Sequence, residues 1–402
     1  MVRIAKRRLR QVRPAWRVPG VSGASGSQNA VGSWCTAGLV VRGQADGLHA
    51  YDVGTGEAVW SWIAPGRTAL LAMSRTAVSG VGLAVHADGS ADGSSGDEPV
   101  DCTVTAVGVE DGTALWSVPF DLSGGSWSRS LLEHHLGGAV AVAPNRAVLL
   151  TDGLQAYALN SGRPVWPPTA ALAGDVQLSV CRDGIIQIGL DDGHLTVRCL
   201  DAAEGTVRWE TAPSTHGPVD TVHVLQEDPL AVLCRGRGSG GLEEVLVLDA
   251  EDGRTAGRIP VSEHGELRVA AYGPVDGLHA GERAASVGEL LVAVVRPAEP
   301  CGDDLTAFAL DGGAPHWTRR SQGLVVNVFA VDGDVVVVSR PNGLVRVHLL
   351  DGATGAVLAV RRLAGYEAGM RGRYYLDAHH RLVHVSPWGD RKWHPLQMFP
   401  LR

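Results

Sequence analysis

The stretch YDVGTGEAVWSW (Tyr51–Trp62) decides how this sequence is interpreted. It contains a Gly-Thr-Gly turn between an alternating segment, Leu48–Val53, and a second alternating segment that includes Trp60 and Trp62. Apolar residues at every second position on both sides of a glycine turn predict a β-hairpin. The glycine supplies the positive φ angle that such a turn needs. If this hairpin recurs at a regular interval, it defines the whole fold.

The hairpin pattern recurs six more times along the chain. Each copy has an alternating strand, an acidic or asparagine-containing turn ending in glycine, and a strand whose fourth residue is Trp or a substitute. The copies are TVTAVGVEDGTALWSV (Thr103–Val118), LQAYALNSGRPVWPP (Leu154–Pro168), LTVRCLDAAEGTVRWET (Leu195–Thr211), VLVLDAEDGRTAGRIPV (Val245–Val261), LTAFALDGGAPHWTRR (Leu305–Arg320) and VRVHLLDGATGAVLAVRRL (Val345–Leu363). Their spacing of about 40 to 60 residues is the size of a four-stranded propeller blade.

Two further strands precede each hairpin, as DVQLSVCRDGIIQIGLDDGHLTVRCLDAAEGTVRWE illustrates. Glycine-containing turns divide this unit into four short alternating segments. The predicted strands are Val176–Val180, Ile185–Leu190, Leu195–Leu200 and Thr206–Glu210. The same order appears in VVNVFAVDGDVVVVSRPNGLVRVHLL (Val325–Leu350). Each repeat is therefore predicted to be one four-stranded antiparallel blade.

The two ends of the chain complete the count of blades. The last unit, Arg373–Met398, supplies only three strands, and RPAWRVPG (Arg13–Gly20) can supply the fourth because Trp16 falls at the tryptophan position. The sequence thus predicts an all-β, eight-bladed β-propeller of four-stranded antiparallel blades over residues 13–402, closed by its N- and C-terminal strands. The alternative is a seven-bladed ring with loose ends. The eight tryptophan positions are Trp16, Trp60, Trp116, Trp166, Trp209, Arg258 (a substitute), Trp317 and Leu358 (a substitute), and their side chains are expected to pack structurally against the neighbouring blade.

The charge of the chain is unevenly distributed. Residues 1–17 hold seven of the 35 basic residues and no acidic residue, so 28 basic residues face 43 acidic residues in the remainder. An acidic body is a poor platform for nucleic acid, and no nucleic-acid partner is expected. Residues 1–12 are interpreted as a basic N-terminal arm, either solvated or lying on an acidic surface, with RNA or anionic lipid as alternative contacts.

Composition also bears on location and redox chemistry. The sequence has no run of 18 apolar residues and no secretory signal at its start, so we expect a cytoplasmic protein without a membrane span. Its six cysteines lack CxxC spacing, which favours reduced thiols over disulfides or a zinc site. Only two of the 35 basic residues are lysine, a usage typical of a GC-rich genome such as that of an actinobacterium.

The motif AYDVGTGEAVW and its copies resemble the repeat of the PQQ-like (quinoprotein alcohol dehydrogenase-like) propeller family. That repeat reads roughly Ala, hydrophobic, Asp, two residues, Thr-Gly, two or three residues, Trp. The match is specific at Tyr51–Trp60 and good at Val104–Trp116 and Leu154–Trp166. The family includes quinone-dependent dehydrogenases, an outer-membrane assembly lipoprotein and sensor-like propellers. The resemblance therefore implies the fold more strongly than the function.

The resemblance also bears on cofactors. Family members that use the quinone have two adjacent cysteines beside it and Glu, Asn and Asp around calcium, whereas this chain has no Cys-Cys pair. Neither PQQ nor calcium is expected, and the absence of a lipobox disfavours the lipoprotein role. No metal is expected at His134-His135 or His379-His380, because adjacent strand residues point to opposite faces. The acidic run at Asp88–Asp97 lacks the ligand spacing of a calcium loop.

Three long irregular segments are candidates for recognition: Asp121–Gly138, Leu363–Tyr375 and His86–Asp101. The candidate binding residues in them are Trp127, Arg129, His134, His135, Tyr366, Arg371 and Arg373. We expect a non-catalytic module that binds a protein or peptide, or scaffolds one, on its loop-rich face. The alternatives are a tailoring enzyme of bacterial secondary metabolism that acts on a small molecule in the central depression, and a quinone-dependent dehydrogenase. No catalytic residue is identified, since no local catalytic motif is present.

Overall fold

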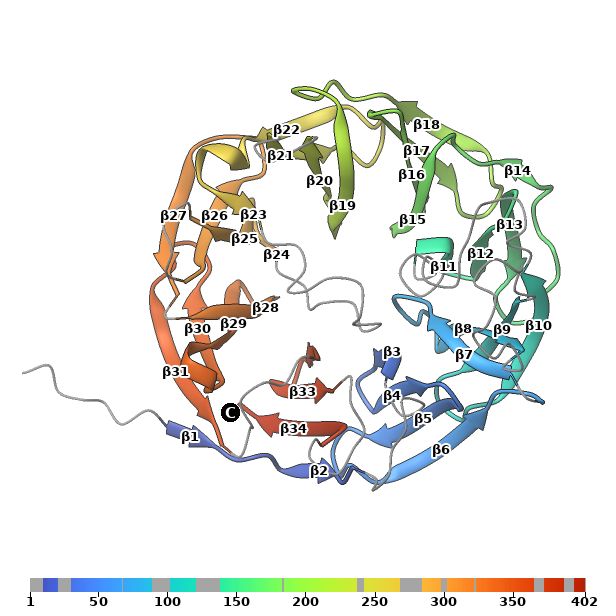
Figure 1. The fold of residues 1–402 in the computed structure, drawn as a ribbon, viewed down its shortest axis with the longest axis horizontal. Helices are drawn as coiled ribbons and strands as arrows, with labels where there is room; N and C mark the ends of the chain where they lie inside the picture. The colour runs from blue at the N-terminus through green and yellow to red at the C-terminus, as the bar shows by residue number, and fades with distance from the viewer. Residues whose placement is uncertain are drawn as a thin grey trace, which may run out of the picture.

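The computed structural model describes residues 10–20, 30–66, 68–88, 102–120, 138–182, 184–236, 242–267, 284–297, 302–321, 323–364, 372–386 and 394–401. In these residues the chain forms eight sheets, which lie around a central axis like the blades of a propeller (Figure 1). The main strands of each blade pair in antiparallel order from the axis outwards, and the N-terminal segment adds outer strands to the last two blades, one of them parallel. The predicted all-β, eight-bladed propeller is therefore confirmed, and the seven-bladed alternative is wrong.

The blades are numbered here along the chain. Blade 1 contains β3 (Ala30–Cys35), β4 (Leu39–Gln44), β5 (Gly47–Asp52) and β6 (Ala58–Ile63), and blade 2 contains β7 (Thr68–Met73), β8 (Val81–Asp88), β9 (Cys102–Gly108) and β10 (Ala114–Phe120). Blade 3 contains β11 (Val140–Ala143), β12 (Arg146–Leu150), β13 (Gly153–Ala158) and β14 (Thr169–Ala170). Blade 4 contains β15 (Asp175–Cys181), β16 (Gly184–Asp191), β17 (His194–Asp201) and β18 (Val207–Thr211).

The next three blades are slightly less regular. Blade 5 contains β19 (Val219–Glu227), β20 (Leu230–Gly236), β21 (Glu243–Leu248) and β22 (Thr255–Ile259). Blade 6 contains β23 (Glu266–Leu267), β24 (Ala284–Val287), β25 (Leu290–Arg296), β26 (Asp304–Ala309) and β27 (Pro315–Arg320). Blade 7 contains β28 (Leu324–Val331), β29 (Asp334–Arg340), β30 (Arg346–Asp351) and β31 (Val357–Leu363). In blade 6, β23 and β24 both pair with β25. Short 3-10 turns at Val261–Glu263 and Pro341–Gly343 are part of the connections.

Blade 8 is assembled from both ends of the chain. It contains β32 (Arg373–Leu376), β33 (Arg381–Val385) and β34 (Leu396–Pro400), and its outermost strand is β2 (Trp16–Val18). The register places Trp16 opposite Met398 in an antiparallel pair. The predicted closure of the ring by the two terminal strands is confirmed.

The N-terminal segment also reaches the neighbouring blade. Strand β1 (Arg10–Val12) pairs in parallel with β31 and extends blade 7 by a fifth strand. Its last residue, Val12, is buried with Leu382 and Phe399 of blade 8. Residues 10–12, which the sequence assigned to the basic arm, therefore belong to the sheet because their backbone completes an edge. The rest of the arm, residues 1–9, lies outside the described part of the chain.

The core lies between neighbouring blades. Middle strands are buried on both faces, as in β29, where Val335 to Val338 are at most 2 % exposed. Such strands read as continuous apolar runs because each face packs against a different blade. The outermost strands are more exposed, and in β6 only Trp62 is buried.

The predicted tryptophans join successive blades. Trp60 of blade 1 donates its indole N–H to the carbonyl oxygen of Val109 in blade 2, at 3.0 Å. The same ring covers Gly112, whose φ is 73° and whose Cβ, if it had one, would lie 2.5 Å from Trp60. Equivalent bonds are Trp16–Val53, Trp116–Leu159, Trp166–Ala203, Trp209–Ala250 and Trp317–Gly352. The predicted packing of these rings on the neighbouring blade is confirmed.

Two junctions lack this contact. At the first, Gly312 of blade 6 lies against the backbone of Arg258 in blade 5. At the second, Leu358 of blade 7 is 52 % exposed, and β1 covers the edge of the same blade. The N-terminal strand thus reinforces a junction that has no tryptophan.

The blade topology defines two faces. First and second strands, and third and fourth strands, are joined at one end, called here the turn face. Second and third strands, and successive blades, are joined at the other end, called here the loop face. The strands that flank the three predicted recognition segments, β8 and β9, β10 and β11, and β31 and β32, are joined at the loop face.

Candidate functional site

Of the seven predicted binding residues, one lies in the part of the chain that the structure describes. Six of them, Trp127, Arg129, His134, His135, Tyr366 and Arg371, lie outside the described residues. The seventh, Arg373, is the first residue of β32 and is 9 % exposed. Its guanidinium lies over the ring of Tyr375, 4.8 Å from the ring centroid. Cation–π contacts of this kind hold a guanidinium in a fixed position.

Arg373 lines a cavity of about 260 Å³ on the propeller axis, called here the axial cavity. Its walls come from four blades: strands β3, β28 and β32, and the segment that follows β7 (Figure 1). The lining residues are Trp34, Cys35, Arg75, Thr76, Ala77, Asn327, Phe329, Arg373, Tyr374, Tyr375 and Leu376. The cavity combines two arginines with four aromatic side chains. Among the described residues that line it there is no carboxylate.

Two walls of the axial cavity are held by hydrogen bonds that join blade 1 to blade 8 and to blade 2. The Tyr375 hydroxyl donates to the carbonyl oxygen of Ser33 at 2.7 Å, and it lies 2.7 Å from the Ser33 hydroxyl. Trp34 donates its indole N–H to the carbonyl oxygen of Ser74 at 2.8 Å. These bonds satisfy buried polar groups and position the rings of the cavity.

An ion pair crosses the axis next to the cavity. Arg75, which follows β7 in blade 2, lies 3.9 Å from Glu227 at the end of β19 in blade 5. Glu227 also accepts a 2.8 Å hydrogen bond from Ser179 in blade 4. Arg75 is thereby held at the centre of the ring by contacts between side chains of three blades.

The chemistry of the axial cavity suits binding better than nucleophilic attack. Burial, followed by the charge of Asp377, raises the pKa of the Cys35 thiol to about 12, so the thiol stays protonated at neutral pH. The charged groups that line the cavity are Arg75 and Arg373. Guanidinium groups next to aromatic walls attract carboxylates and leave room for apolar neighbours of the carboxylate.

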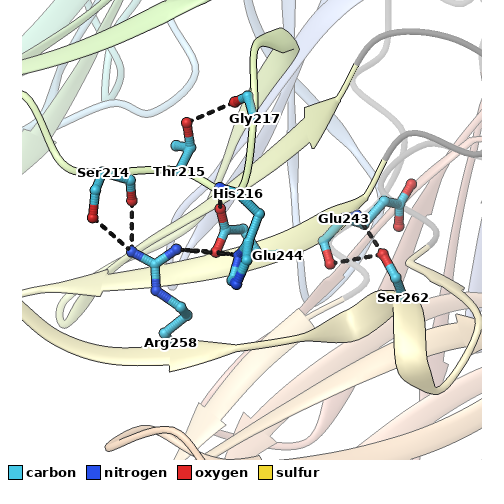
Figure 2. Close-up of polar contacts among 8 residues, drawn as sticks. All are labelled: Ser214, Thr215, His216, Gly217, Glu243, Glu244, Arg258 and Ser262. Carbon is cyan, nitrogen blue, oxygen red and sulfur yellow. Dashed lines mark hydrogen bonds and ion pairs between the residues drawn. The ribbon is translucent and has the colours of Figure 1, made fainter.

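A second polar cluster lies in blade 5, near the loop face (Figure 2). Glu244 on β21 is 5 % exposed on its side chain, and its carboxylate accepts bonds from three donors. These are the backbone N–H of His216 at 2.9 Å, Nδ1 of His216 at 2.8 Å, and the Arg258 guanidinium. Arg258 also donates to Ser214 in the connection between blades 4 and 5. The carboxylate is well satisfied, which indicates a structural role.

The neighbouring connection is fixed in the same region. Ser262, in the 3-10 turn after β22, donates its hydroxyl to the carbonyl oxygen of Glu243 at 3.1 Å (Figure 2). The Glu243 carboxylate accepts the backbone N–H of Leu267 in blade 6 at 2.7 Å. Polar contacts thus join blades 5 and 6 where the tryptophan is missing.

This cluster was not predicted as a site. The only signal in the sequence was the arginine at a tryptophan position, Arg258. Its partners Glu244 and His216 lie 14 and 42 residues away along the chain. A cavity of about 170 Å³ lies beside His216 and Glu244.

Of the two histidine pairs, the structure describes His379-His380. His380 adopts a positive φ of 56° in the turn between β32 and β33, as predicted for this pair, and its Nε2 lies 3.9 Å from Asp332. The other pair, His134-His135, lies outside the described residues. Within the described ranges, no three His, Cys, Asp or Glu side chains are grouped as a metal site would require.

Eight antiparallel blades, joined at six junctions by a bond from a tryptophan to the next turn, define an eight-bladed β-propeller built from tryptophan-containing repeats. The family model described as outer membrane protein assembly factor BamB matches residues 100–357. Because this match spans more than half of the sequence, the chain belongs to that family. The resemblance to the quinoprotein-like propeller repeat is thereby confirmed. No curated protein matches the sequence.

Solved structures agree on the fold. BamB from Moraxella catarrhalis is 15% identical with a TM-score of 0.53, and 96% of each chain is covered. Quinohemoprotein alcohol dehydrogenase from Comamonas testosteroni is 12% identical with a TM-score of 0.55, covering 97% of this chain and 75% of that one. The C-terminal WD40 domain of Sif2 is 10% identical with a TM-score of 0.55, covering 98% and 99%. At such identities the likeness shows the fold alone.

The helical content adds one finding. Nowhere in the described ranges is there a helix of the length and apolarity needed to cross a membrane.

Proposed function

We propose that this propeller is a non-catalytic binding module that holds an acidic segment of a partner protein at its axial cavity. The observation that carries the proposal is the pairing of Arg75 and Arg373 in one aromatic-walled cavity on the axis. The two arginines come from different blades and approach the cavity from different walls. A peptide carboxylate flanked by an apolar residue matches both the charge and the walls.

The arginines retain the capacity to bind. A guanidinium has five N–H donors, so the 3.9 Å contact of Arg75 with Glu227 leaves donors for a ligand. The Arg373 guanidinium lies over the Tyr375 ring, 4.8 Å from its centroid, and this contact leaves N–H donors of the group for a ligand. Anchors of this type, arginine and tyrosine in a concave site, are the residues that dominate interface energies.

The comparisons support a role in protein binding. The family is described as a protein assembly factor, and WD40 propellers occur among the similar folds. We further propose that the module works without a quinone or calcium, which the lack of a Cys-Cys pair in the sequence supports. An absorbance titration of the purified full chain with the quinone tests this second point, and saturable binding would contradict it.

The test of the proposed function uses a matched pair of labelled peptides. One is a short peptide with Asp and Glu around a central Phe, and the other carries Asn and Gln at the same positions. We expect saturable binding of the acidic peptide to the full chain, measured by fluorescence anisotropy. Arg373→Gln should weaken it about tenfold or more, because a charge-assisted bond is lost. Arg373→Lys should restore part of the affinity because it retains the charge.

The control variant is Arg182→Gln. Arg182 is 66% exposed on its side chain and pairs with Asp228 on the turn face, outside the axial cavity. The substitution removes one positive charge, as Arg373→Gln does, but outside the axial cavity, so binding of the acidic peptide should be unchanged. Equal binding of the acidic and amide peptides, or equal loss in the Arg182 and Arg373 variants, would contradict the proposal.

A further inference from the structure

A separate cavity of about 370 Å³ lies between blades 6 and 7, called here the inter-blade slot. It lies between β26 and β27 on one side and β29, β30 and β31 on the other. These strands lie in adjacent blades on one side of the ring (Figure 1). The slot shares no lining residue with the axial cavity. Its volume is within the range of small-molecule sites.

The inner wall of the slot is apolar. Leu305 from blade 6, and Val337 and Leu350 from blade 7, line it and are at most 3 % exposed. Val357 and Val360 of β31 extend this surface outwards. A surface of this composition suits a hydrocarbon chain and not a multiply charged ligand.

Basic side chains line the rest of the slot. Arg319 of β27 comes from blade 6 and Arg346 of β30 from blade 7, so they lie on the two sides of the slot. Arg319 is held by a 3.2 Å bond from its Nη1 to the carbonyl oxygen of Gly355. His348 of β30 also lines the slot, and its Nε2 lies 3.1 Å from the Ser339 hydroxyl.

The electrostatics of the slot favour a single negative charge. Burial, and then the charges of Arg346 and Arg319, lower the pKa of His348 to about 4, so this ring is neutral at pH 7. Arg320 also lines the slot and donates a 2.7 Å hydrogen bond to Asp304. None of the described lining residues is acidic. Arg319 and Arg346 therefore bring two guanidinium groups to the edge of an apolar wall.

We propose that the inter-blade slot binds a small monocarboxylic acid with an unbranched apolar chain. The carboxylate lies between Arg319 and Arg346, and the chain lies along Leu305, Val337 and Leu350. A carboxylate matches the planar guanidinium group, and the apolar wall gains from burying the chain. A phosphate or a dicarboxylate would place a second charge against that wall at a desolvation cost.

The test uses octanoate as the probe, below its micelle concentration, with the full chain. Isothermal titration calorimetry should show one saturable site, and the ring resonances of His348 should shift with the same saturation curve. Octan-1-ol and acetate should each bind at least tenfold more weakly, since one lacks the charge and the other the chain. Arg319→Gln and Arg346→Gln should each weaken octanoate binding about tenfold or more.

Two further variants distinguish a loss of binding from a loss of folding. Val360→Phe fills the apolar part of the slot and should abolish binding while the melting curve stays cooperative. Arg182→Gln removes a distant exposed arginine and should leave octanoate binding unchanged. Equal binding of octanoate and octan-1-ol, or full binding to both Arg319→Gln and Val360→Phe, would overturn the proposal. Absence of saturable binding to the unmodified chain would also overturn it.

Discussion

The indole N–H of Trp16 donates a 2.8 Å hydrogen bond to the carbonyl oxygen of Val53, and this bond joins the last blade to the first. The two residues are 37 positions apart, and they belong to different copies of the repeat. The tryptophan of one hairpin therefore covers the glycine turn of the next hairpin and not its own. Five other junctions repeat the arrangement.

The close contact between ring and turn predicts a strong glycine requirement. Gly56 has a φ of 76°, and an added Cβ would lie 2.5 Å from Cδ2 of Trp16. Gly56→Ala should lower the free energy of unfolding by about 2–4 kcal/mol, because backbone strain and overpacking add. The control is Gly66→Ala, whose φ is 66° but whose Cβ meets nothing within 4 Å. It should cost about 1 kcal/mol in urea unfolding. Equal losses would show that the ring contact contributes nothing.

The tryptophan position itself can be compared between blades. Trp60 packs on Gly112 and bonds to Val109, whereas Leu358 occupies the same repeat position and is 52 % exposed. Trp60→Ala should destabilise the protein by about 2–4 kcal/mol, through lost aromatic burial and a carbonyl left without its partner. Leu358→Ala should change stability by about 0.5 kcal/mol or less. Thermal and urea unfolding measure both, and a similar loss in the two variants would argue against a specific inter-blade role.

Ring closure predicts a large effect of truncation. Deleting residues 1–20 removes β1 and β2 and leaves the edges of β31 and β34 unpaired. We expect a lower and broader melting transition and concentration-dependent association, because open sheet edges pair with other chains. Calorimetry and light scattering measure these changes. Deleting only residues 1–9 retains both strands and should leave the melting curve unchanged. A truncated 21–402 chain that melts like the full chain would contradict the closure.

The buried carboxylate of blade 5 predicts a charge-specific loss. Glu244→Gln removes the acceptor charge that faces Arg258 and His216. The variant should lose about 2–4 kcal/mol of unfolding free energy, because a partly buried guanidinium is left without its counter-charge. Asp228 is 47% exposed on its side chain and pairs with Arg182, which is 66% exposed, so Asp228→Asn should cost about 0.5 kcal/mol or less. Urea unfolding of both variants at neutral pH checks the difference.

The inter-blade slot predicts a pH dependence of stability. The folded-state pKa of His348 is about 4, below its ordinary value of 6.5, so the unfolded chain binds the proton more tightly. Stability should be intact above pH 6.5 and decline as the pH falls towards 4, with His348 contributing up to about 3 kcal/mol. His348→Gln cannot titrate, so its unfolding free energy should fall less between pH 7 and pH 4.5. Parallel curves for the variant and the unmodified chain would contradict this assignment.

The sequence predicted the fold well because the repeat contains its own structural rules. The glycine turn sets each hairpin, and alternation sets each strand. In blade 4, the predicted strand Leu195–Leu200 corresponds to the observed β17, His194–Asp201. The incomplete last unit, together with Trp16, was sufficient to predict the shared blade. These features depend on neighbours a few residues apart, which a sequence shows directly.

The candidate sites were much less predictable. Arg373 was predicted as a binding residue of the loop-rich face and lines the axial cavity, but its neighbour there, Arg75, carried no local signal. The sequence also showed no sign that Arg319 and Arg346 line the same slot, or that Arg258 pairs with Glu244. Each site brings together single side chains from separate blades, and no short motif encodes such a set.

By itself, the sequence determined the number of blades, the order of strands within them and the way the ring closes. Those properties follow from local backbone preferences, repeated at a regular interval and completed at the two termini. Only the tertiary structure decided which hairpin each tryptophan covers, that a strand from the N-terminal arm completes blade 7, and where the arginines gather. The reason is that these contacts depend on the angle and distance between whole blades, which the side chains of both blades set together.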